Sequence, residues 1–527
     1  MSRPRPPRAL AIAAAVSATV AAPVVSASQR YASAAASIVP VPMASSCAAP
    51  AAHEVDTGAA WLLVRAPDVA RAAFDRATDL DPDCALAYWG RAVARLDAAG
   101  ASGGSPAAIA ALLSDISRAG AVPARTPFER AAVAALQRLA TREAAPGVPA
   151  AWPIRVAAYR DAICAGAPDA IWCGFALAGE PGPQAGAERA LRWVVDHARE
   201  APLDLGAAVI VLETAPDPQA PIVERALAAV SAQDPPAPVP HALASRVAAR
   251  RGAWAAAVTA AGRVRASAPD AVSRAAAADA ALEALLQLGR RTEAYALART
   301  AVPVAADAPA AAPEDAAARA WARVALGDRR LDGRGLADRT ALQLDAGVAA
   351  RWPVVFVTGL DAALRAWPGG DRARLAEARA AATALDDLAG GDPRSEIAWA
   401  RAVLEAAIAA SQDEHQQMAL FFTHAADLEA QLVAGGRIAL PLVPTRELAA
   451  ELWLRTYRYD DARREARAVA SALPNRVSPA IVLARTAARL QDPAAAELWR
   501  AVLDLRASAD ANDSLRLEAT QALGPSR

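Results

Sequence analysis

The chain has no lysine, and all 56 of its basic residues are arginine. This absence excludes the phosphate-binding lysine of P-loop proteins, Schiff-base chemistry and serine–lysine nucleophiles. Acidic residues also number 56, so the formal net charge is zero. Because there is no surplus of positive charge to neutralise phosphates, we do not expect nucleic acid as a partner.

Histidine and cysteine are scarce as well, with five and four residues. There is no C-x-x-C pair, which argues against a zinc ribbon or a covalently attached haem. His415 and His424 are nine positions apart, which places them on roughly opposite faces of a helix. The sequence therefore predicts neither a metal site nor a cofactor.

The four cysteines are Cys47, Cys84, Cys164 and Cys173. Cys164 and Cys173 flank a proline-containing turn and could join two adjacent helices in an oxidising compartment. Cys84 falls inside a predicted repeat, where a buried free thiol is the favoured interpretation. The sequence leaves the pairing of all four open.

One motif of catalytic type is present. Residues 100–104 match G-x-S-x-G, the pattern of a nucleophilic serine on a strand-to-helix turn. The preceding residues 89–99 have the pattern of a helix, and no parallel-sheet pattern occurs elsewhere. We therefore predict that Ser102 is not catalytic and that the chain is not an enzyme.

Aromatic residues make up only 5% of the chain, and alanine supplies much of its 55% hydrophobic content. Alanine favours helices but buries little area, so an alanine-rich core needs close contacts and a few large anchors. The candidate anchors are Trp61, Phe74, Trp89, Trp193, Trp254 and Trp453.

The amino terminus has the pattern of an export signal. Arginines at positions 3, 5 and 8 precede the small apolar run Ala9–Val25, and Val25-Ser26-Ala27 fits a cleavage site. We predict a signal peptide over 1–27 and a periplasmic or extracellular location. The alternative is an uncleaved anchor, which Pro23 disfavours. No other stretch resembles a membrane span.

What the chain does contain is a repeat pattern. Gly58, Ala70, Phe74, Ala77 and Pro82 follow one another at offsets of 12, 4, 3 and 5. This spacing is typical of the tetratricopeptide repeat (TPR), a helix hairpin of about 34 residues. The small residues let two helices approach, the aromatic ring fills the space between hairpins, and the proline ends the second helix.

The same register recurs farther along the chain. The matching positions are Gly252, Trp254 and Ala257, then Gly289, Ala294 and Ala298, then Tyr459, Ala462, Ala466 and Pro474, with Ala496 one period of 34 after Ala462. The period blurs over 100–240 and 310–440. Residues 352–360 are rich in β-branched valine, but their neighbours favour a buried helix.

The predicted fold is all-α, a TPR-like solenoid of antiparallel helix hairpins wound into a right-handed superhelix. We expect a linker over 28–48, an N-terminal array over 49–301 and a C-terminal array over 315–527. An Ala/Pro-rich loop over 302–314 separates the two arrays.

Three blocks resemble a group of bacterial TPR proteins of uncertain function. They are Asp81–Gly90; Pro444–Leu448 with Tyr459–Ala462 and Leu473–Arg476; and His241–Arg246 before Gly252 and Trp254. The resemblance covers about a quarter of the chain directly and implies the same fold. Members of that group carry several histidines here, but Arg246 replaces one of them and Leu205–Leu212 is apolar. The resemblance therefore weakens any enzymatic interpretation.

These observations predict an exported, non-catalytic scaffold that binds a protein or peptide partner along the array. The candidate contacts are Tyr88, Arg91, Arg95, Arg246, Arg250, Glu447 and Glu451. The alternative is a helical enzyme or ligand-binding protein, whose cleft would bring Glu213 and His241 together. A third possibility is a purely scaffolding role in envelope assembly.

Overall fold

The computed structural model describes residues 38–99, 105–140, 143–145, 148–149, 151–167, 171–178, 185–197, 203–268, 270–301, 312–331, 350–367, 370–390, 396–434 and 441–524. The predicted signal peptide at 1–27, the G-x-S-x-G motif at 100–104 and residues 302–311 of the predicted loop lie outside these ranges.

The described residues of the first half form helices α2 to α15 and one small sheet. The helices are α2 (Ala49–Leu63), α3 (Pro67–Leu80), α4 (Ala85–Ala99), α5 (Pro106–Ala121), α6 (Pro127–Ala140), α7 (Trp152–Gly166), α8 (Ile171–Ala178), α9 (Ala185–His197), α10 (Leu205–Thr214), α11 (Pro221–Gln233), α12 (Pro238–Arg250), α13 (Trp254–Ser267), α14 (Ala271–Leu288) and α15 (Arg291–Ala301). Strands β1 (Glu143–Ala145) and β2 (Val148–Pro149) pair antiparallel between α6 and α7.

The described residues of the second half are helical. The helices are α16 (Ala312–Leu331), α18 (Trp352–Ala366), α19 (Arg372–Ala389), α20 (Glu396–Ser411), α21 (His415–Ala434), α22 (Thr445–Arg455), α23 (Tyr459–Ala472), α24 (Val477–Arg489), α25 (Ala495–Leu505) and α26 (Ser514–Leu523). The valine-rich residues 352–360 lie in α18, which confirms the helical interpretation of that run.

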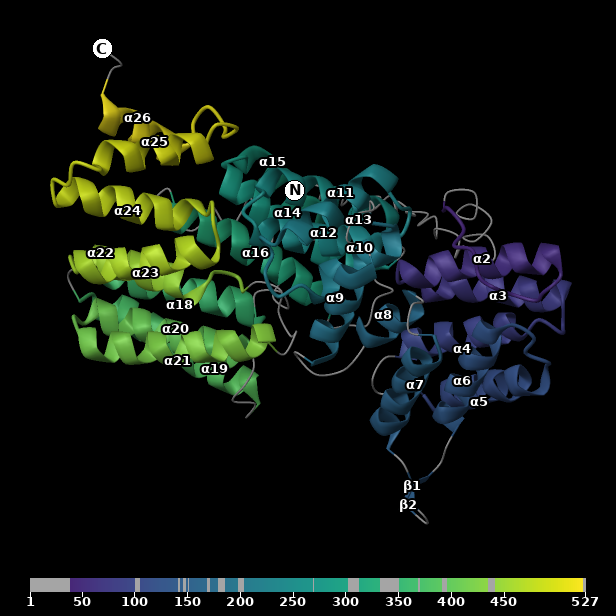
Figure 1. Cartoon of the computed structure of the whole chain (residues 1–527). Coiled ribbons are helices and arrows are strands. Elements are labelled where there is room, and N and C mark those ends of the chain that lie inside the picture. The colour runs from purple at the N-terminus through teal and green to yellow at the C-terminus, as the bar shows by residue number, and fades with distance from the viewer. Residues whose placement is uncertain are drawn as a thin grey trace, which may run out of the picture.

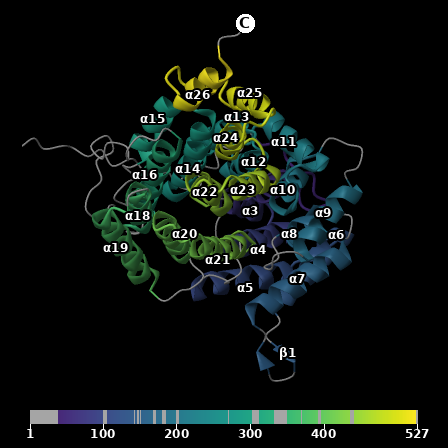
Figure 2. The ribbon, with the colours of Figure 1, turned by 90° about the vertical axis from the view of Figure 1, so that its left-hand side faces the viewer.

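Consecutive helices pack as hairpins, such as α2 with α3, α12 with α13 and α22 with α23 (Figure 1). Most even-numbered helices also contact the next even-numbered helix, as α2 contacts α4 and α20 contacts α22. They therefore form one layer, and the view in Figure 2 places α12, α14 and α22 inward of α11, α15 and α19. This arrangement confirms the predicted all-α solenoid of hairpins.

Phe74 shows why the first repeat has its spacing. Its ring is fully buried between two glycines, and a Cβ added to Gly58 of α2 or Gly90 of α4 would come within 2.8 or 2.2 Å of that ring. Ala70 and Ala77, one turn on either side along α3, are also fully buried. The small positions thus make room for one large ring.

The later repeat positions are also confirmed where they were predicted as turns or close contacts. Gly252 and Gly289 follow helices with φ of 70° and 75°, in the left-handed region that favours glycine. Ala257, Ala294, Ala298, Ala462 and Ala466 are fully buried, Trp254 is nearly so, Tyr459 begins α23, and Pro82 and Pro474 lie in turns after helices.

The expectation for Ala496 is wrong, because this residue is exposed. Helix α23 begins at Tyr459 and α25 at Ala495, which is 36 positions later rather than 34. The extra residues lie in the connection before α25, and they shift its buried face to Trp499 and Val502.

The buried hydrophobic residues form two main clusters. One runs from Ile38 to Val247 and the other from Ala261 to Ala519, so they meet near α12 and α13. The second cluster includes residues on both sides of 302–314. The predicted division into two arrays at that loop stays a prediction, and the described helices that flank the loop share one core.

The array also folds back on itself in two places. In the first half α10 packs against α2. Between the two halves, the indole Nε1 of Trp254 donates to the carbonyl oxygen of Asn475 at 2.7 Å, and Arg506 donates to the carbonyl of Leu286 at 2.7 Å. Among the described residues, no helix has both the length and the apolar character to cross a bilayer.

Candidate functional site

Helix α12 presents a narrow stripe of accessible residues. Most of its side chains are buried, including Leu243 and Val247, whereas Ala242 and Arg246 are exposed and Arg250 is partly exposed. These three positions are four apart, so they lie on one side of the helix. The stripe lies where the two main core clusters meet.

Arg246 is accessible but surrounded by protein. Burial lowers the pKa of its guanidinium, the nearby Glu213 carboxylate opposes this shift, and Arg250 adds to it. Within the described residues, neither Arg246 nor Arg250 has an ion pair or a side-chain hydrogen bond. Two adjacent cations thus stand without a bound anion on an inner helix.

The neighbouring carboxylates are already engaged. Arg65, which follows α2, donates to both oxygens of Glu213 at 3.0 and 2.8 Å and to Asp97 of α4 at 3.0 Å. Burial raises the pKa of Asp97, Arg65 lowers it, and repulsion from Glu213 raises it further, with a net rise. We call Arg65, Asp97, Glu213, Arg246 and Arg250 the junction patch.

The charge of the junction patch follows from these contacts. Three guanidiniums face two carboxylates, and Arg65 contacts both carboxylates itself. Arg246 and Arg250 therefore keep most of their capacity to bind an anion, and guanidinium groups bind carboxylates in a fixed bidentate geometry. The arrangement suits recognition of an acidic segment.

The candidate contact residues on α4 are bonded to other residues of the chain. Arg91 and Arg95 donate to the two oxygens of Asp115 on α5, each at 2.7 Å, and Asp115 is buried. The hydroxyl of Tyr88 donates to the carbonyl of Pro82 at 3.2 Å. These side chains are partly accessible, but their polar groups already join α4 to its neighbours.

Of the two glutamates on α22, Glu447 is not available to a partner. Its side chain is 1% exposed and pairs with the guanidinium of Arg476, so its prediction as a groove contact is wrong. The sequence pattern did not reveal that Arg476, 29 positions away, covers this side chain. Glu451 is accessible, accepts from the Ser478 hydroxyl, and lines a small pocket with Arg455 and Arg485.

Glu213 and His241 do not converge. The Nε2 atom of His241 lies 2.8 Å from the carbonyl oxygen of Pro235 and 3.6 Å from Asp234, whereas Glu213 is bound to Arg65. Burial lowers the pKa of His241, although Pro235 and Asp234 oppose this shift. Neither residue lines either of the two described pockets. The cleft required by the enzyme alternative is not formed by these residues.

Three features were missed by the sequence analysis. Cys84 pairs with Cys47, so the expectation of a free thiol is wrong, whereas the Cys164–Cys173 pair joins α7 to α8 as considered.

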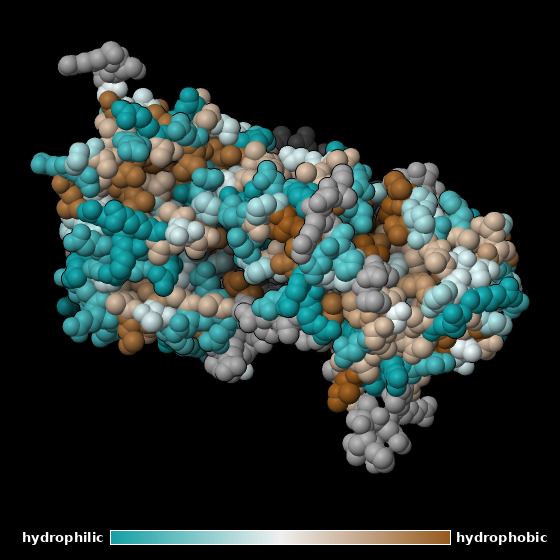
Figure 3. All heavy atoms as spheres, in the orientation of Figure 1, coloured by the Kyte–Doolittle hydropathy of each residue, from teal (hydrophilic) through white to brown (hydrophobic). Residues whose placement is uncertain are grey.

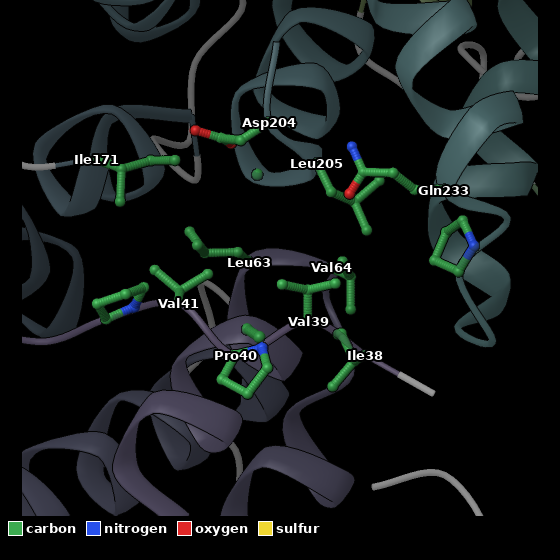
Figure 4. Close-up of a pocket in the computed structure, with 14 residues that line it drawn as sticks. Ile38, Val39, Pro40, Val41, Leu63, Val64, Ile171, Asp204, Leu205 and Gln233 are labelled. Carbon is green, nitrogen blue, oxygen red and sulfur yellow. The ribbon is translucent and has the colours of Figure 1, made fainter. Parts of the chain in front are cut away.

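Residues 38–42, inside the predicted linker, line a pocket of about 310 Å³ (Figure 4). The signal for this segment was Pro40 and Pro42, which favour an extended backbone. The sequence analysis also missed a buried ion network, in which Glu283 of α14 pairs with Arg323 and Arg476.

No protein-family model and no curated protein matches the chain. Among solved structures, the chain is similar to the crystal structure of the P58(IPK) TPR domain, with 14% identity, coverage of 84% of this chain and 99% of that chain, and a TM-score of 0.17. A TM-score this low carries no argument, so the fold rests on the helix pairs described above. The chain is an all-α solenoid of TPR-like helix hairpins.

Proposed function

We propose that this protein is an exported, non-catalytic scaffold that binds an acidic segment of a protein partner at the junction patch. The observation that carries the proposal is the pair of guanidiniums on α12, Arg246 and Arg250, which make no ion pair and no side-chain hydrogen bond within the described residues. Inner-layer arginines elsewhere, such as Arg323 and Arg476, are paired with carboxylates.

The character of the surface supports polar recognition. On the face shown in Figure 3, hydrophilic residues cover most of the area over α21, α22 and α23, and hydrophobic residues occur in separate smaller groups. A continuous apolar patch would favour a hydrophobic partner. Two neighbouring guanidinium groups, of which Arg246 is partly desolvated, instead favour a carboxylate-rich segment.

Export is supported by the cysteines and by the amino-terminal pattern. All four cysteines are paired, and disulfides of this kind persist in oxidising compartments. Together with the signal-like residues 1–27, this favours the periplasm or the exterior of the cell.

The test is a double charge reversal, Arg246→Glu with Arg250→Glu, in affinity capture from a periplasmic extract. We expect loss of an acidic partner that the wild-type protein captures, and capture by the wild type should weaken as salt is raised. The matched control reverses Arg265 and Arg467, which are exposed on α13 and α23, and should keep the partner. Equal capture by both double variants would contradict the proposal.

A further inference from the structure

Residues 38–47, which we call the strap, run back along α2 without forming a helix or strand. Ile38 lines the pocket beside Val64, just past the end of α2, and Ala48 directly precedes the start of that helix. Ten residues therefore span a helix of 15 residues, or about 22 Å, which is farther than the roughly 15 Å that ten helical residues would cover, so the backbone is more extended than a helix. The strap thus lies antiparallel to α2.

Hydrogen bonds hold the strap chiefly through its backbone. The amides of Val41 and Met43 donate to the carbonyl and the carboxylate of Asp56 at 3.1 and 2.7 Å. The Ser46 amide donates to Glu129 of α6 at 2.5 Å, and the Thr126 hydroxyl donates to the carbonyl of Ala44 at 2.8 Å. Groups of this kind are present in any extended peptide, so the site is not restricted to this one sequence.

The strap side chains alternate between the protein and solvent over residues 41–44. Val41 and Met43 pack against the first core cluster, whereas Pro42 and Ala44 are exposed. Ile38, three positions before Val41, is also buried, and Val39 is 78% exposed. The indole of Trp172 on α8 contacts the Met43 sulfur at 3.1 Å. Backbone contacts with alternate inward side chains are the way in which a protein surface recognises an extended peptide.

Space remains at the amino-terminal end of the strap. The pocket of about 310 Å³ lies between the strap, α2 and the starts of α8 and α10, and its lining is mostly apolar. Figure 4 shows Ile38 and Val39 on one side of it and Leu205 and Gln233 on the other. A longer apolar side chain than those of the strap would fit there.

The strap is tethered at its other end. Cys47 is joined to Cys84, and the Ala48 amide donates to Asp81 at 2.8 Å. A tethered segment acts at a high effective concentration, so it excludes a competing peptide far better than a free copy would.

We infer that the surface formed by α2, α6 and α8 is a binding site for extended peptides with apolar residues at alternate positions. The strap is its built-in occupant, which must leave before such a peptide can bind. This site is separate from the junction patch, and its test does not involve Arg246 or Arg250.

The test uses the full chain with the strap released by Cys47→Ser, Val41→Pro and Met43→Pro. The two prolines remove the amides that donate to Asp56, and the serine removes the disulfide to Cys84. The probe is a labelled peptide with the sequence of residues 38–46, followed by fluorescence anisotropy. We expect the released chain to bind this peptide at least tenfold more tightly than the wild type.

Two further variants identify the site. Glu129→Gln, added to the released chain, should weaken peptide binding about tenfold, whereas Asp68→Asn on the exposed start of α3 should leave it unchanged. A scrambled peptide of the same composition should bind poorly. A folded released chain that binds the peptide no better than the wild type would overturn the inference, as would equal binding of the scrambled peptide.

A second measurement decides the case if the released chain fails to fold. Hydrogen exchange in the wild-type protein should show the Val41 and Met43 amides exchanging at least 100-fold faster than the buried centre of α2. Faster exchange would show that the strap opens while the array stays folded. Exchange at the same rate as α2 would overturn the inference, because the strap would then be an inseparable part of the core.

Discussion

Arg476 and Glu283 are 193 positions apart, and their side chains meet with 2.7 Å between Nη2 and Oε1. Both are buried. The same glutamate pairs with Arg323 of α16, and Arg476 also pairs with Glu447 of α22. This network joins α14 to α16 and α22 within the second core cluster.

The first prediction concerns this network. Arg476→Met should lower the free energy of unfolding by about 3–5 kcal/mol, because it removes the buried cation that Glu447 and Glu283 share. Urea denaturation followed by circular dichroism measures the change. Arg464→Met is the control: Arg464 is 62% exposed and pairs with Asp461 on the surface, so its loss should cost below about 1 kcal/mol. Similar costs for the two variants would contradict the role of the network.

The second prediction concerns the two glycines around Phe74. Gly90→Ala should destabilise the protein by about 1–3 kcal/mol, since the added Cβ would lie 2.2 Å from the ring. Gly262→Ala, in the middle of α13, has open space around its Cβ and should stabilise by about 0.5–1 kcal/mol through helix propensity. Denaturation curves of the two variants should show changes of opposite sign in the free energy of unfolding. Changes of the same sign would contradict the contact between Gly90 and the Phe74 ring.

The third prediction concerns the disulfides. On chain entropy alone, loss of the Cys164–Cys173 link should cost about 3 kcal/mol and loss of the Cys47–Cys84 link about 4 kcal/mol, because the second closes a longer loop. The chain has no cysteine after Cys173. Reduction should therefore move the unfolding of the helices around the first core cluster to lower urea while leaving those around the second cluster unchanged, and tryptophan fluorescence can follow both. A single transition that shifts as a whole would argue against separate halves.

The fourth prediction concerns acid. Burial acts to raise the pKa of Glu129, but hydrogen bonds from the amides of Thr126, Ser46 and Arg125 and from the Ser46 hydroxyl outweigh it and lower the pKa. A carboxyl with a lowered pKa in the folded state stabilises the fold above its unfolded pKa of about 4.3. That stability is lost as the pH falls through the lower folded value.

The measurement compares stability and strap exchange at pH 5 and pH 3. The wild type should lose stability and expose the strap amides at the lower pH. Glu129→Gln should be less stable at pH 5 and should show a smaller change between the two values. Asp68→Asn, an exposed acid on α3 with no hydrogen bond to the described residues of the strap, should keep the wild-type pH dependence. Equal pH dependence in the wild type and Glu129→Gln would show that this carboxyl does not link the strap to acid.

The register of small residues predicted the helix hairpins well, because it reflects contacts between neighbours in the sequence. Phe74 and its glycines lie within about one repeat of each other, so their spacing records the packing directly. The candidate site was predicted only in part. The pattern selected Arg246 and Arg250 as accessible, but it selected Glu447 in the same way, although Arg476 covers that residue.

The sequence by itself determined that the chain is helical, where many of its hairpins turn, and that it lacks the residues of several catalytic classes. These properties depend on side-chain size and spacing within one repeat. Only the tertiary structure decided which charges are buried, which cysteines pair and what lies beside α2. Those contacts join residues from different repeats, and their meeting depends on how far the whole array bends, which no local spacing specifies.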